Sequence, residues 1–227
     1  MDINSKLLHV RTKTEAVYDM LKETIIAGEL LPGERIVLRQ LAQKLGISGI
    51  PIREAIKQLA SEGLVTVSPH SEITVTNLSA KEFEELSGIR AVLESYAAGV
   101  MTQRQGHSQV IPLQECLNQM ELALETNDHR SYGKFDNQFH QIICSNCGNE
   151  QLYATIQGLA NRTDRARALF IMEPQRMRNS YLEHLDIVEA IKSGDSARVE
   201  VAVRSHKENA FSSYYKHQFE NLKEDTK

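Results

Sequence analysis

The sequence predicts a mainly α-helical protein in two parts, an N-terminal winged helix-turn-helix and a C-terminal all-α antiparallel helical bundle. Between residues 34 and 76, two short amphipathic helices separated by a glycine are followed by two β-prone runs. After residue 78 no alternating strand pattern occurs. Apolar residues recur there at helical spacing in segments separated by short breakers, which is typical of a helical bundle.

The first expected element is a helix over residues 13–27. Its apolar face consists of four residues at helical spacing: Val17, Met20, Leu21 and Ile25. Gly28 would end this helix, and Leu31-Pro32-Gly33 would turn the chain.

The next two helices form the predicted helix-turn-helix. The first carries Leu38, Leu41, Ala42 and Leu45 at helical spacing. Gly46 would end it, because glycine readily adopts the left-handed conformation found after helix C-termini. Ser48 can cap the second helix, and Pro51 falls in its first turn, where a missing N–H costs least. The second helix has its own apolar stripe, formed by Ile52, Ala55, Ile56 and Leu59. Gly63 would end this helix.

Two β-prone runs follow, residues 64–67 and 73–76, separated by residues 68–72. Helix, tight turn, helix and small hairpin in this order are a winged helix-turn-helix. Such a unit lays its second helix in the major groove of DNA and its hairpin against the backbone or the minor groove.

The residues expected at the DNA come from the two helices, the turn and the wing tip: Arg39, Ser48, Gly49, Ile50, Pro51, Arg53, Lys57 and His70. Arg53 would reach base edges, since the bidentate contact of arginine with guanine is the commonest specific pairing. A salt bridge to Glu54 or Glu34 is the alternative. Arg39 and Lys57, together with Lys44, would hold phosphates, which fix position rather than sequence.

Bulk properties exclude several classes of protein. The net charge of the 227 residues is -4, whereas a protein that coats nucleic acid without sequence preference carries a positive net charge. Residues 1–76 contain nine Lys+Arg and nine Asp+Glu, so the remainder carries the whole net charge. No apolar run approaches membrane-spanning length, and the N-terminus lacks the apolar region of a signal peptide. Three cysteines make no disulfide framework, so we expect a cytoplasmic protein with no membrane partner.

The boundary between the two parts is expected just before Ser79-Ala80-Lys81-Glu82, which has the form of a helix-capping box. We therefore expect a DNA-binding domain over residues 1–77 and an effector-binding and dimerisation domain over residues 78–227. The second domain should contain five or six helices, roughly 79–104, 109–126, 128–145, 149–171, 174–193 and 195–219. Breakers lie between them at Gly106, Asn127-Asp128, Gly148-Asn149, Pro174 and Gly194-Asp195.

Three of these helices place ionisable residues on their apolar faces. Asp136 and His140 lie one turn apart on one stripe, His184 lies near the centre of another, and His206 lies on that of the last helix. Buried ionisable groups are costly unless they are paired or bind a metal. One carboxylate and three imidazoles make a good ligand set for a divalent transition ion such as Zn²⁺, Ni²⁺ or Mn²⁺.

The alternative for each histidine is a hydrogen-bonded residue of the core, which is the commoner role of a single inward-facing imidazole. Three such residues together with Asp136 favour the metal site. Cys144-x2-Cys147 is a weak signal, because a second CxxC that would complete a four-thiolate site is missing. Cys144 lies one turn beyond His140, so a redox or metal role stays open for it.

Several segments also carry a resemblance to a known family. In the first part they are Gly28-Glu29-Leu30-x-Pro32-Gly33-Glu34, Leu41-Ala42-x-x-Leu45-Gly46-Ile47-Ser48, Pro51-Ile52-Arg53-Glu54-Ala55-Ile56 and Glu62-Gly63-Leu64-Val65. In the second they are Arg90-x3-Glu94, Phe135-Asp136-x2-Phe139-His140, Gly148-Asn149-x2-Leu152, Glu183-His184 and His206. Over nearly the whole chain, these segments resemble the GntR family of bacterial transcription regulators, in the FadR-type branch with an FCD effector domain.

The resemblance implies a dimeric transcription factor whose bundle senses a small molecule. The family's metal-binding aspartate and three histidines would fall on Asp136, His140, His184 and His206, the residues also selected by periodicity. Six bundle helices are similar to the family's smaller, VanR-type variant. The two DNA-binding domains of a homodimer would bind a double-stranded DNA operator that contains an inverted repeat.

Two departures from the family pattern concern the DNA-reading surface. Gly49-Ile50 stands where the family usually has arginine followed by threonine. The wing tip, Pro69-His70-Ser71, lacks the usual glycine. Arg39 and Arg53 match other contacting positions of the family. The family's common operator sequence is therefore not transferred to this chain.

The effector is expected to be a small organic acid that completes the coordination shell of the metal. A carboxylate needs a cationic partner beside the metal, and Arg90, Arg162 and Arg165 are the candidates. A structural ion pair is the alternative for each of them.

Two other functions compete with this hypothesis. A metal-dependent hydrolase or lyase fused to a DNA-binding head could use an open metal position to activate water. It would need a general base, but no further inward carboxylate stands out, and we expect Glu183 to point away from the metal; we therefore predict no enzyme. In the other alternative, the regulator responds to the metal itself.

Overall fold

The computed structural model describes residues 11–26, 29–69, 72–77, 79–168 and 174–216. The chain divides into two units, residues 1–77 and 78–227. Each unit has its own apolar core.

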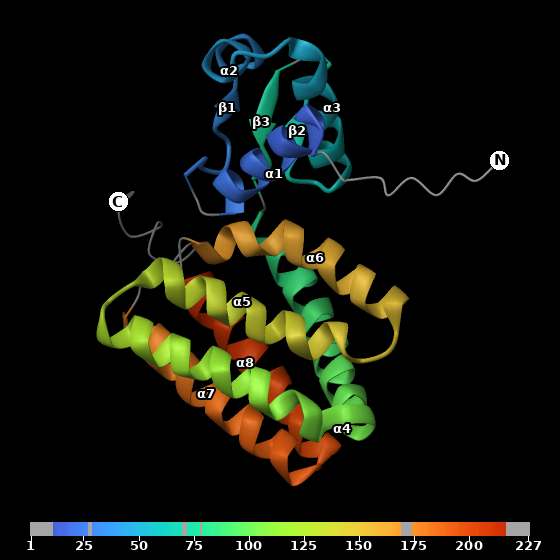
Figure 1. Cartoon of the computed structure of the whole chain (residues 1–227), viewed down its shortest axis with the longest axis vertical. Coiled ribbons are helices and arrows are strands. Elements are labelled where there is room, and N and C mark those ends of the chain that lie inside the picture. The colour runs from blue at the N-terminus through green and yellow to red at the C-terminus, as the bar shows by residue number, and fades with distance from the viewer. Residues whose placement is uncertain (1–10, 27–28, 70–71, 78, 169–173, 217–227) are drawn as a thin grey trace, which may run out of the picture. The chain divides into compact units, whose positions relative to one another are not determined.

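The first unit contains three helices and a small sheet (Figure 1). The helices are α1 (Lys13–Ile26), α2 (Leu38–Leu45) and α3 (Gly49–Ser61). The strands are β1 (Arg35–Ile36), β2 (Val65–Val67) and β3 (Ile73–Val75). The sheet is antiparallel with the order β1-β3-β2, and Thr66 of β2 pairs with Thr74 of β3. The helix-turn-helix and its wing are thus present.

The buried faces of the helices and the sheet form the core of this unit. It consists of the apolar stripes of α1 and α3 with residues of the strands: Val17, Leu21, Ile25, Ile36, Ile52, Ala55, Ile56, Leu59, Leu64, Val65, Ile73 and Val75. The α3 stripe expected from the sequence is completely buried, so the opposite face of α3 remains exposed.

Local signals determine the ends of α2 and α3. Gly46 follows α2 with φ +63° and ψ +31°, as expected for a left-handed glycine. Ser48 occupies the N-cap position of α3 with an extended backbone, but its side chain makes no capping hydrogen bond. The expected capping role of Ser48 is therefore wrong. Strand β1 was not expected, because two residues are too short for a recognisable alternation.

In its described residues, the second unit consists of five helices (Figure 1). They are α4 (Ala80–Glu125), α5 (His129–Ser145), α6 (Glu150–Ala168), α7 (Pro174–Ser193) and α8 (Ser196–Tyr215). α4 packs against each of the other four helices, and α7 packs against α8. None of the helices in the described ranges is both long and apolar enough to span a membrane.

The beginning of α4 agrees with the predicted capping box. The Ser79 hydroxyl accepts a hydrogen bond from the Glu82 amide, and the Glu82 carboxylate accepts one from the Ser79 amide. The two helices expected on either side of Gly106 are both present within α4, which is kinked between them. The cause of the kink lies in the backbone of Gln105, which leaves the helical region at φ -156° and ψ 26°. The kink gives six helical segments in the described part of the bundle.

Candidate metal centre and nucleic-acid interface

Four ionisable side chains meet inside the second unit. Asp136 and His140 come from α5, His184 from α7 and His206 from α8. Their exposed fractions are only 2, 7, 0 and 2%. The ring of Phe139 packs edge-on against His184, with 4.6 Å between the ring centroids. The helical periodicity that buries the apolar stripes therefore also buries these four polar groups.

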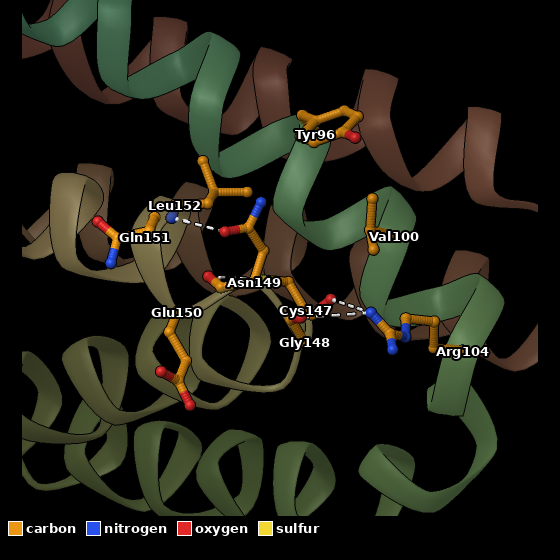
Figure 2. A pocket seen from close by; sticks show the side chains of 9 residues that line it. All are labelled: Tyr96, Val100, Arg104, Cys147, Gly148, Asn149, Glu150, Gln151 and Leu152. Carbon is orange, nitrogen blue, oxygen red and sulfur yellow. Dashed lines mark hydrogen bonds between the residues drawn. The ribbon is translucent and has the colours of Figure 1, made fainter.

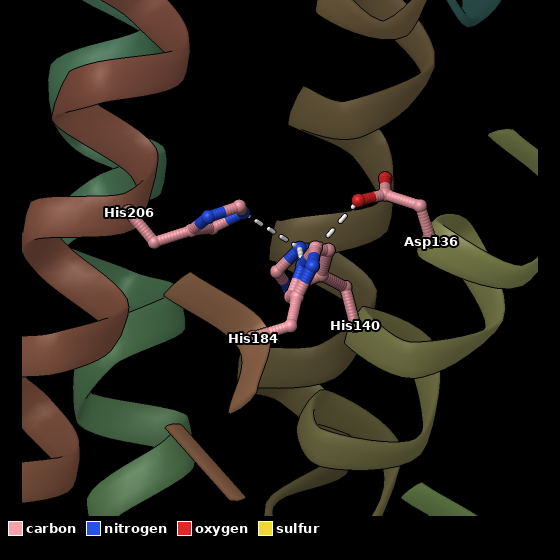
Figure 3. Close-up of side chains that lie close together, drawn as sticks. All are labelled: Asp136, His140, His184 and His206. Atoms are coloured by element: carbon pink, nitrogen blue, oxygen red, sulfur yellow. Dashed lines mark hydrogen bonds and ion pairs between the residues drawn. The ribbon is translucent and has the colours of Figure 1, made fainter. Parts of the chain in front are cut away.

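The ligand atoms of the four side chains lie within 4.8 Å of one another (Figure 3). His140 Nε2 lies 3.1 Å from His206 Nε2 and 3.2 Å from His184 Nε2. His184 Nε2 lies 3.3 Å from Asp136 Oδ1. Two ligands bound at about 2.0–2.1 Å to one ion in octahedral or tetrahedral geometry are separated by about 2.8–3.4 Å. The three separations of 3.1–3.3 Å therefore fit ligands of a single shared ion.

Glu183 determines which nitrogen His206 presents to this cluster. The Glu183 Oε2 atom lies 2.7 Å from His206 Nδ1, on the side of the ring away from the other histidines. An ionised carboxylate only accepts hydrogen bonds, so Nδ1 carries the proton in a neutral ring and Nε2 keeps its lone pair. The carboxylate thus prepares Nε2 as a metal ligand.

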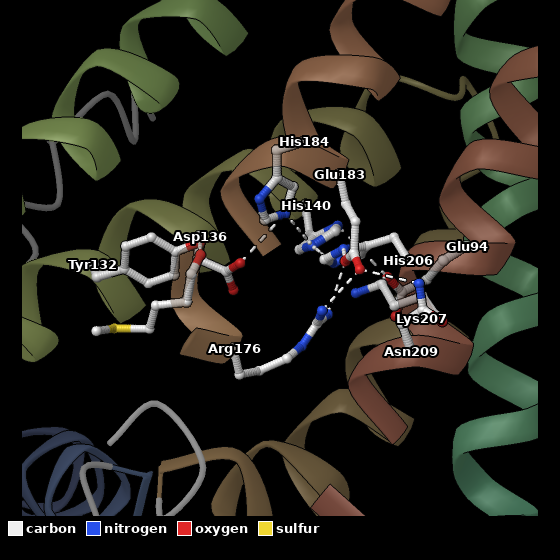
Figure 4. Close-up of polar contacts among 11 residues, drawn as sticks. Glu94, Tyr132, Asp136, His140, Arg176, Glu183, His184, His206, Lys207 and Asn209 are labelled. Atoms are coloured by element: carbon white, nitrogen blue, oxygen red, sulfur yellow. Dashed lines mark hydrogen bonds and ion pairs between the residues drawn. The ribbon is translucent and has the colours of Figure 1, made fainter. Parts of the chain in front are cut away.

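Glu183 is itself held by two further side chains (Figure 4). The Arg176 guanidinium donates to both carboxylate oxygens at 2.8 Å, and Asn209 Nδ2 donates to Oε1 at 3.0 Å. Glu183 thus points elsewhere on the helix than His184, as expected, but its contact with the outer edge of His206 was not expected. Neighbouring residues on a helix differ by about 100° in direction, so Glu183 reaches α8 while His184 faces α5.

A second buried carboxylate lies on the other side of His140. Glu94 Oε2 is 2.6 Å from Lys207 Nζ and 4.0 Å from His140 Nδ1, and Glu94 Oε1 accepts a hydrogen bond from Arg90 Nε at 2.8 Å. Burial raises the pKa of Glu94, but the charges of Lys207 and Arg90 more than offset this effect and lower the pKa to about 2. Glu94 is therefore ionised at neutral pH. The sequence hypothesis included neither Glu94 nor Lys207 in the site.

The imidazole of His140 is neutral in these surroundings. Burial lowers its pKa well below the usual value, and the positive charge of Lys207 lowers it further. A neutral imidazole is the form that binds metals. The donor set, with three imidazoles and one carboxylate, suits a divalent transition ion.

The arginines expected to bind an effector have other surroundings. Arg90 is bonded to Glu94 and to the Thr163 hydroxyl, which favours the structural alternative for this residue. The pKa of Glu82 is lowered mainly by hydrogen bonds from Ser79. Arg162 lies near enough to Glu82 for its positive charge to lower this pKa a little further. The Arg165 side chain lies outside the described residues.

The cysteines are buried thiols. Burial raises the pKa of Cys116 to about 11 and raises that of Cys144 further. Cys147 lies beside a surface hollow of about 450 Å³ between α4 and the start of α6 (Figure 2). Arg104 at this hollow donates to the carbonyl oxygens of Cys147 and Gly148. Neither the thiols nor the hollow adds a ligand to the histidine cluster.

The DNA-reading residues predicted on α3 lie on its exposed face. Ile50, Arg53 and Lys57 are exposed, and Ser48 just before the helix is exposed as well, while Gly49 and Pro51 are half-buried. Lys57 pairs with Glu54 at 2.9 Å, and Glu34 accepts a hydrogen bond from the Leu31 amide. The two acids considered as partners of Arg53 are thus engaged elsewhere. Arg39 of α2 is exposed, and His70 lies outside the described residues.

Comparisons with known proteins agree with this architecture. Residues 13–75 match the gntR family of bacterial regulatory proteins, and residues 85–209 match the FCD domain. The chain belongs to the GntR family and carries an FCD domain. It is a DNA-binding transcriptional regulator and not an enzyme, so the hydrolase or lyase alternative does not apply.

Relatives extend over most of the chain. The HTH-type transcriptional repressor RspR of Escherichia coli is 25% identical over 91% of this chain and 90% of its own length. The transcriptional regulator YdhC of Bacillus subtilis is 27% identical over 91% and 89% of the two chains. Among solved structures, E. coli McbR/YncC matches 91% of this chain and 98% of its own, with a TM-score of 0.81 and 24% identity. This last likeness concerns the fold.

Proposed function

We propose that this GntR-family regulator binds one divalent transition ion through Asp136, His140, His184 and His206. The observation that carries the proposal is the convergence of three imidazole Nε2 atoms and one carboxylate oxygen in the bundle interior. The pKa of His140 is lowered well below its usual value by burial, so its imidazole is neutral and able to bind the ion. A bound Zn²⁺, Ni²⁺ or Mn²⁺ would supply a Lewis-acidic centre that binds an anionic oxygen.

We further propose that the effector is a small carboxylate bound beside this ion. Around the cluster, Glu94 with Arg90 and Lys207 forms a group with one excess positive charge, while Arg176 and Glu183 neutralise each other. Together with a divalent ion and one ligand carboxylate, this balance favours an anion in the bundle interior. Lys207 is therefore a further cation that we associate with the effector, beside the arginines named from the sequence.

The proposed regulator acts as a homodimer on an inverted repeat. Two α3 helices related by two-fold symmetry would enter successive major grooves, since one half-site supports few contacts. The proposal is supported by the small number of exposed cations on α3, Arg53 and Lys57, which makes two heads necessary for tight binding.

Metal analysis of the purified full-length protein tests the metal site. We expect about one ion per chain in the wild type. The double substitution His184→Ala, His206→Ala should remove the ion and also the thermal stabilisation that a bound ligand confers. His107→Ala, at an exposed position of α4, is the matched control. Equal metal content in all three proteins would refute the site.

Metal affinity separates this function from a metal-responsive regulator. An ion bound tightly as a fixed cofactor does not report its own concentration, whereas a sensor exchanges its ion at physiological concentrations. The burial of all four side chains favours the fixed cofactor. Operator binding that follows free metal concentration in the absence of any acid would instead identify the metal as the signal.

A further inference from the structure

An apolar side chain stands on the DNA-reading face of α3. Ile50 is 68% exposed, more than any other large hydrophobic residue described in the first unit. Packing does not require it, because the buried stripe of α3 lies on the opposite face. An exposed isoleucine at this place therefore needs another explanation.

The position of Ile50 is the part of a recognition helix that meets base edges. It is the second residue of α3, and the N-terminal residues of the second helix of a helix-turn-helix contact bases in the major groove. Arg53 lies three residues further along and Lys57 seven, so all three share one face. Arg53 and Lys57 provide the polar and charged contacts of this face.

The Arg53 guanidinium lies beside Gly49, the first residue of α3. A Cβ atom at Gly49 would lie 3.9 Å from the Arg53 guanidinium carbon, so this guanidinium lies over the first turn of the helix. The apolar side chain of Ile50 and the hydrogen-bonding group of Arg53 thus both lie at the first turn of α3.

We propose that Ile50 reads thymine, by contact with the C5-methyl group of one thymine in each operator half-site. An isoleucine side chain can neither donate nor accept a hydrogen bond, and the thymine methyl is the only apolar group that the major groove presents. Ile50 and Arg53 are about 4.5 Å apart along the helix axis, against about 3.4 Å between successive base pairs. The thymine therefore lies one or two base pairs from the guanine that Arg53 is proposed to contact.

Replacing thymine by deoxyuridine tests the contact, because this change removes only the methyl group. Duplexes bound by the full-length protein are first selected from a random library. Each thymine of the selected operator is then replaced in turn. We expect one position per half-site at which deoxyuridine weakens wild-type binding about fourfold, the effect of uncovering one methyl group.

The substitution Ile50→Ala should remove this sensitivity. The variant should bind the thymine operator more weakly than the wild type does. It should bind the thymine operator and the deoxyuridine operator with equal affinity. Lys57→Ala should weaken binding to both operators equally, as a phosphate contact does. Ile111→Ala makes the same change at an exposed position of α4 and should alter neither affinity.

Three outcomes would overturn the proposal. In the first, the selected operator contains no thymine whose replacement by deoxyuridine weakens wild-type binding. In the second, Ile50→Ala is as sensitive to this replacement as the wild type. In the third, Ile50→Ala binds DNA normally but no longer self-associates, and Ile50 is then a protein contact. Loss of guanine preference in Arg53→Ala is measured separately, so a wrong assignment of Arg53 does not affect the result for Ile50.

Discussion

At the scale of single residues, His206 is held by hydrogen bonds on one edge and faces the other histidines with the other edge. Glu183 accepts from Nδ1 at 2.7 Å, while Nε2 lies 3.1 Å from His140 Nε2. Arg176 and Asn209 orient Glu183 in turn. The geometry of the ligand set therefore depends on residues that do not belong to it.

Glu183→Gln is expected to weaken metal binding about 10–100-fold, the usual effect of removing the hydrogen-bond partner of a ligand histidine. The amide has the size of the carboxylate but no negative charge, and it can present an N–H that favours the wrong tautomer. The dissociation constant is measured by competition with a chelator. Glu189→Gln, at an exposed residue of α7 paired with Lys192, should leave it unchanged.

If Glu183→Gln binds the ion as tightly as the wild type, then Glu183 serves the packing of α7 on α8 and does not position His206. The ¹⁵N chemical shifts of the His206 ring distinguish these roles, since they report which nitrogen carries the proton.

Glu94 should make stability depend on acid pH. Its pKa in the folded protein is about 2, below the unfolded value of 4.5. A carboxyl with a lowered folded pKa stabilises fully above its unfolded pKa, and the contribution is lost as the pH falls toward the folded pKa. The contribution corresponds to about 3 kcal/mol and should disappear between about pH 5 and pH 2.

Glu94→Gln tests this dependence. The free energy of unfolding of this variant should lie below that of the wild type at pH 7, and the gap should narrow as the pH falls through this window. Glu85→Gln, at an exposed residue of α4, should track the wild type throughout. A gap independent of pH would mean that Glu94 acts by shape alone.

At the scale of elements, α2 ends because Gly46 adopts a conformation that other residues avoid. Its φ is +63°, and its amide donates to the Ala42 carbonyl. No atom lies within 4 Å of the place where a Cβ would stand, so a substitution there acts through the backbone and not through a clash.

Gly46→Ala should therefore destabilise the first unit by about 1 kcal/mol, the cost of the left-handed conformation for an ordinary residue. Gly46→Asn should cost less, because asparagine tolerates this conformation. Thermal unfolding of the full-length protein should give the highest Tm for the wild type, a lower one for asparagine and the lowest for alanine. Equal Tm values for alanine and asparagine would contradict the conformational explanation.

Elements with a strong local signal could be predicted from the sequence. The apolar stripes located Asp136 and His140 on α5, because one turn separates residues four apart on any helix. Strand β1 has two residues and depends on hydrogen bonds to β3, so it has no pattern of its own.

Contacts between helices explain what was missed in the site. Glu183 reaches its partner on α8, and Glu94 of α4 meets Lys207 of α8. Periodicity tells which face of a helix a residue occupies, but not which helix lies opposite. Ion pairs between helices therefore became visible only in the folded bundle.

At the scale of the whole molecule, the proposed homodimer must meet two half-sites with its two heads at once. Replacing Arg53 by alanine should cost about 1–3 kcal/mol of operator binding and relax the preference at one base per half-site. Insertion of about half a helical turn between the half-sites should weaken binding strongly, because the second half-site then faces away. If Arg53→Ala weakened binding equally on all sequences, Arg53 would be a phosphate contact.

Coupling between the two units should follow from their short connection. β3 ends at Val75 and α4 begins at Ala80, so four residues join the DNA-reading head to the helix that packs against α5, α7 and α8. In the proposed mechanism, an acid bound beside the metal shifts α4 and, through it, the separation of the two heads. Small displacements suffice, since the half-sites lie a fixed distance apart.

This coupling must be reciprocal. If a carboxylic acid weakens operator binding by some factor, the operator must weaken binding of the acid by the same factor, typically 5–150-fold or about 1–3 kcal/mol. Both affinities are measured by titration, with metal-loaded protein and with metal-stripped protein that remains folded. We expect the acid to bind and to change operator affinity only in the metal-loaded form, because the ion holds one of its oxygens. An acid that acts equally on both forms would leave the ion a structural role alone.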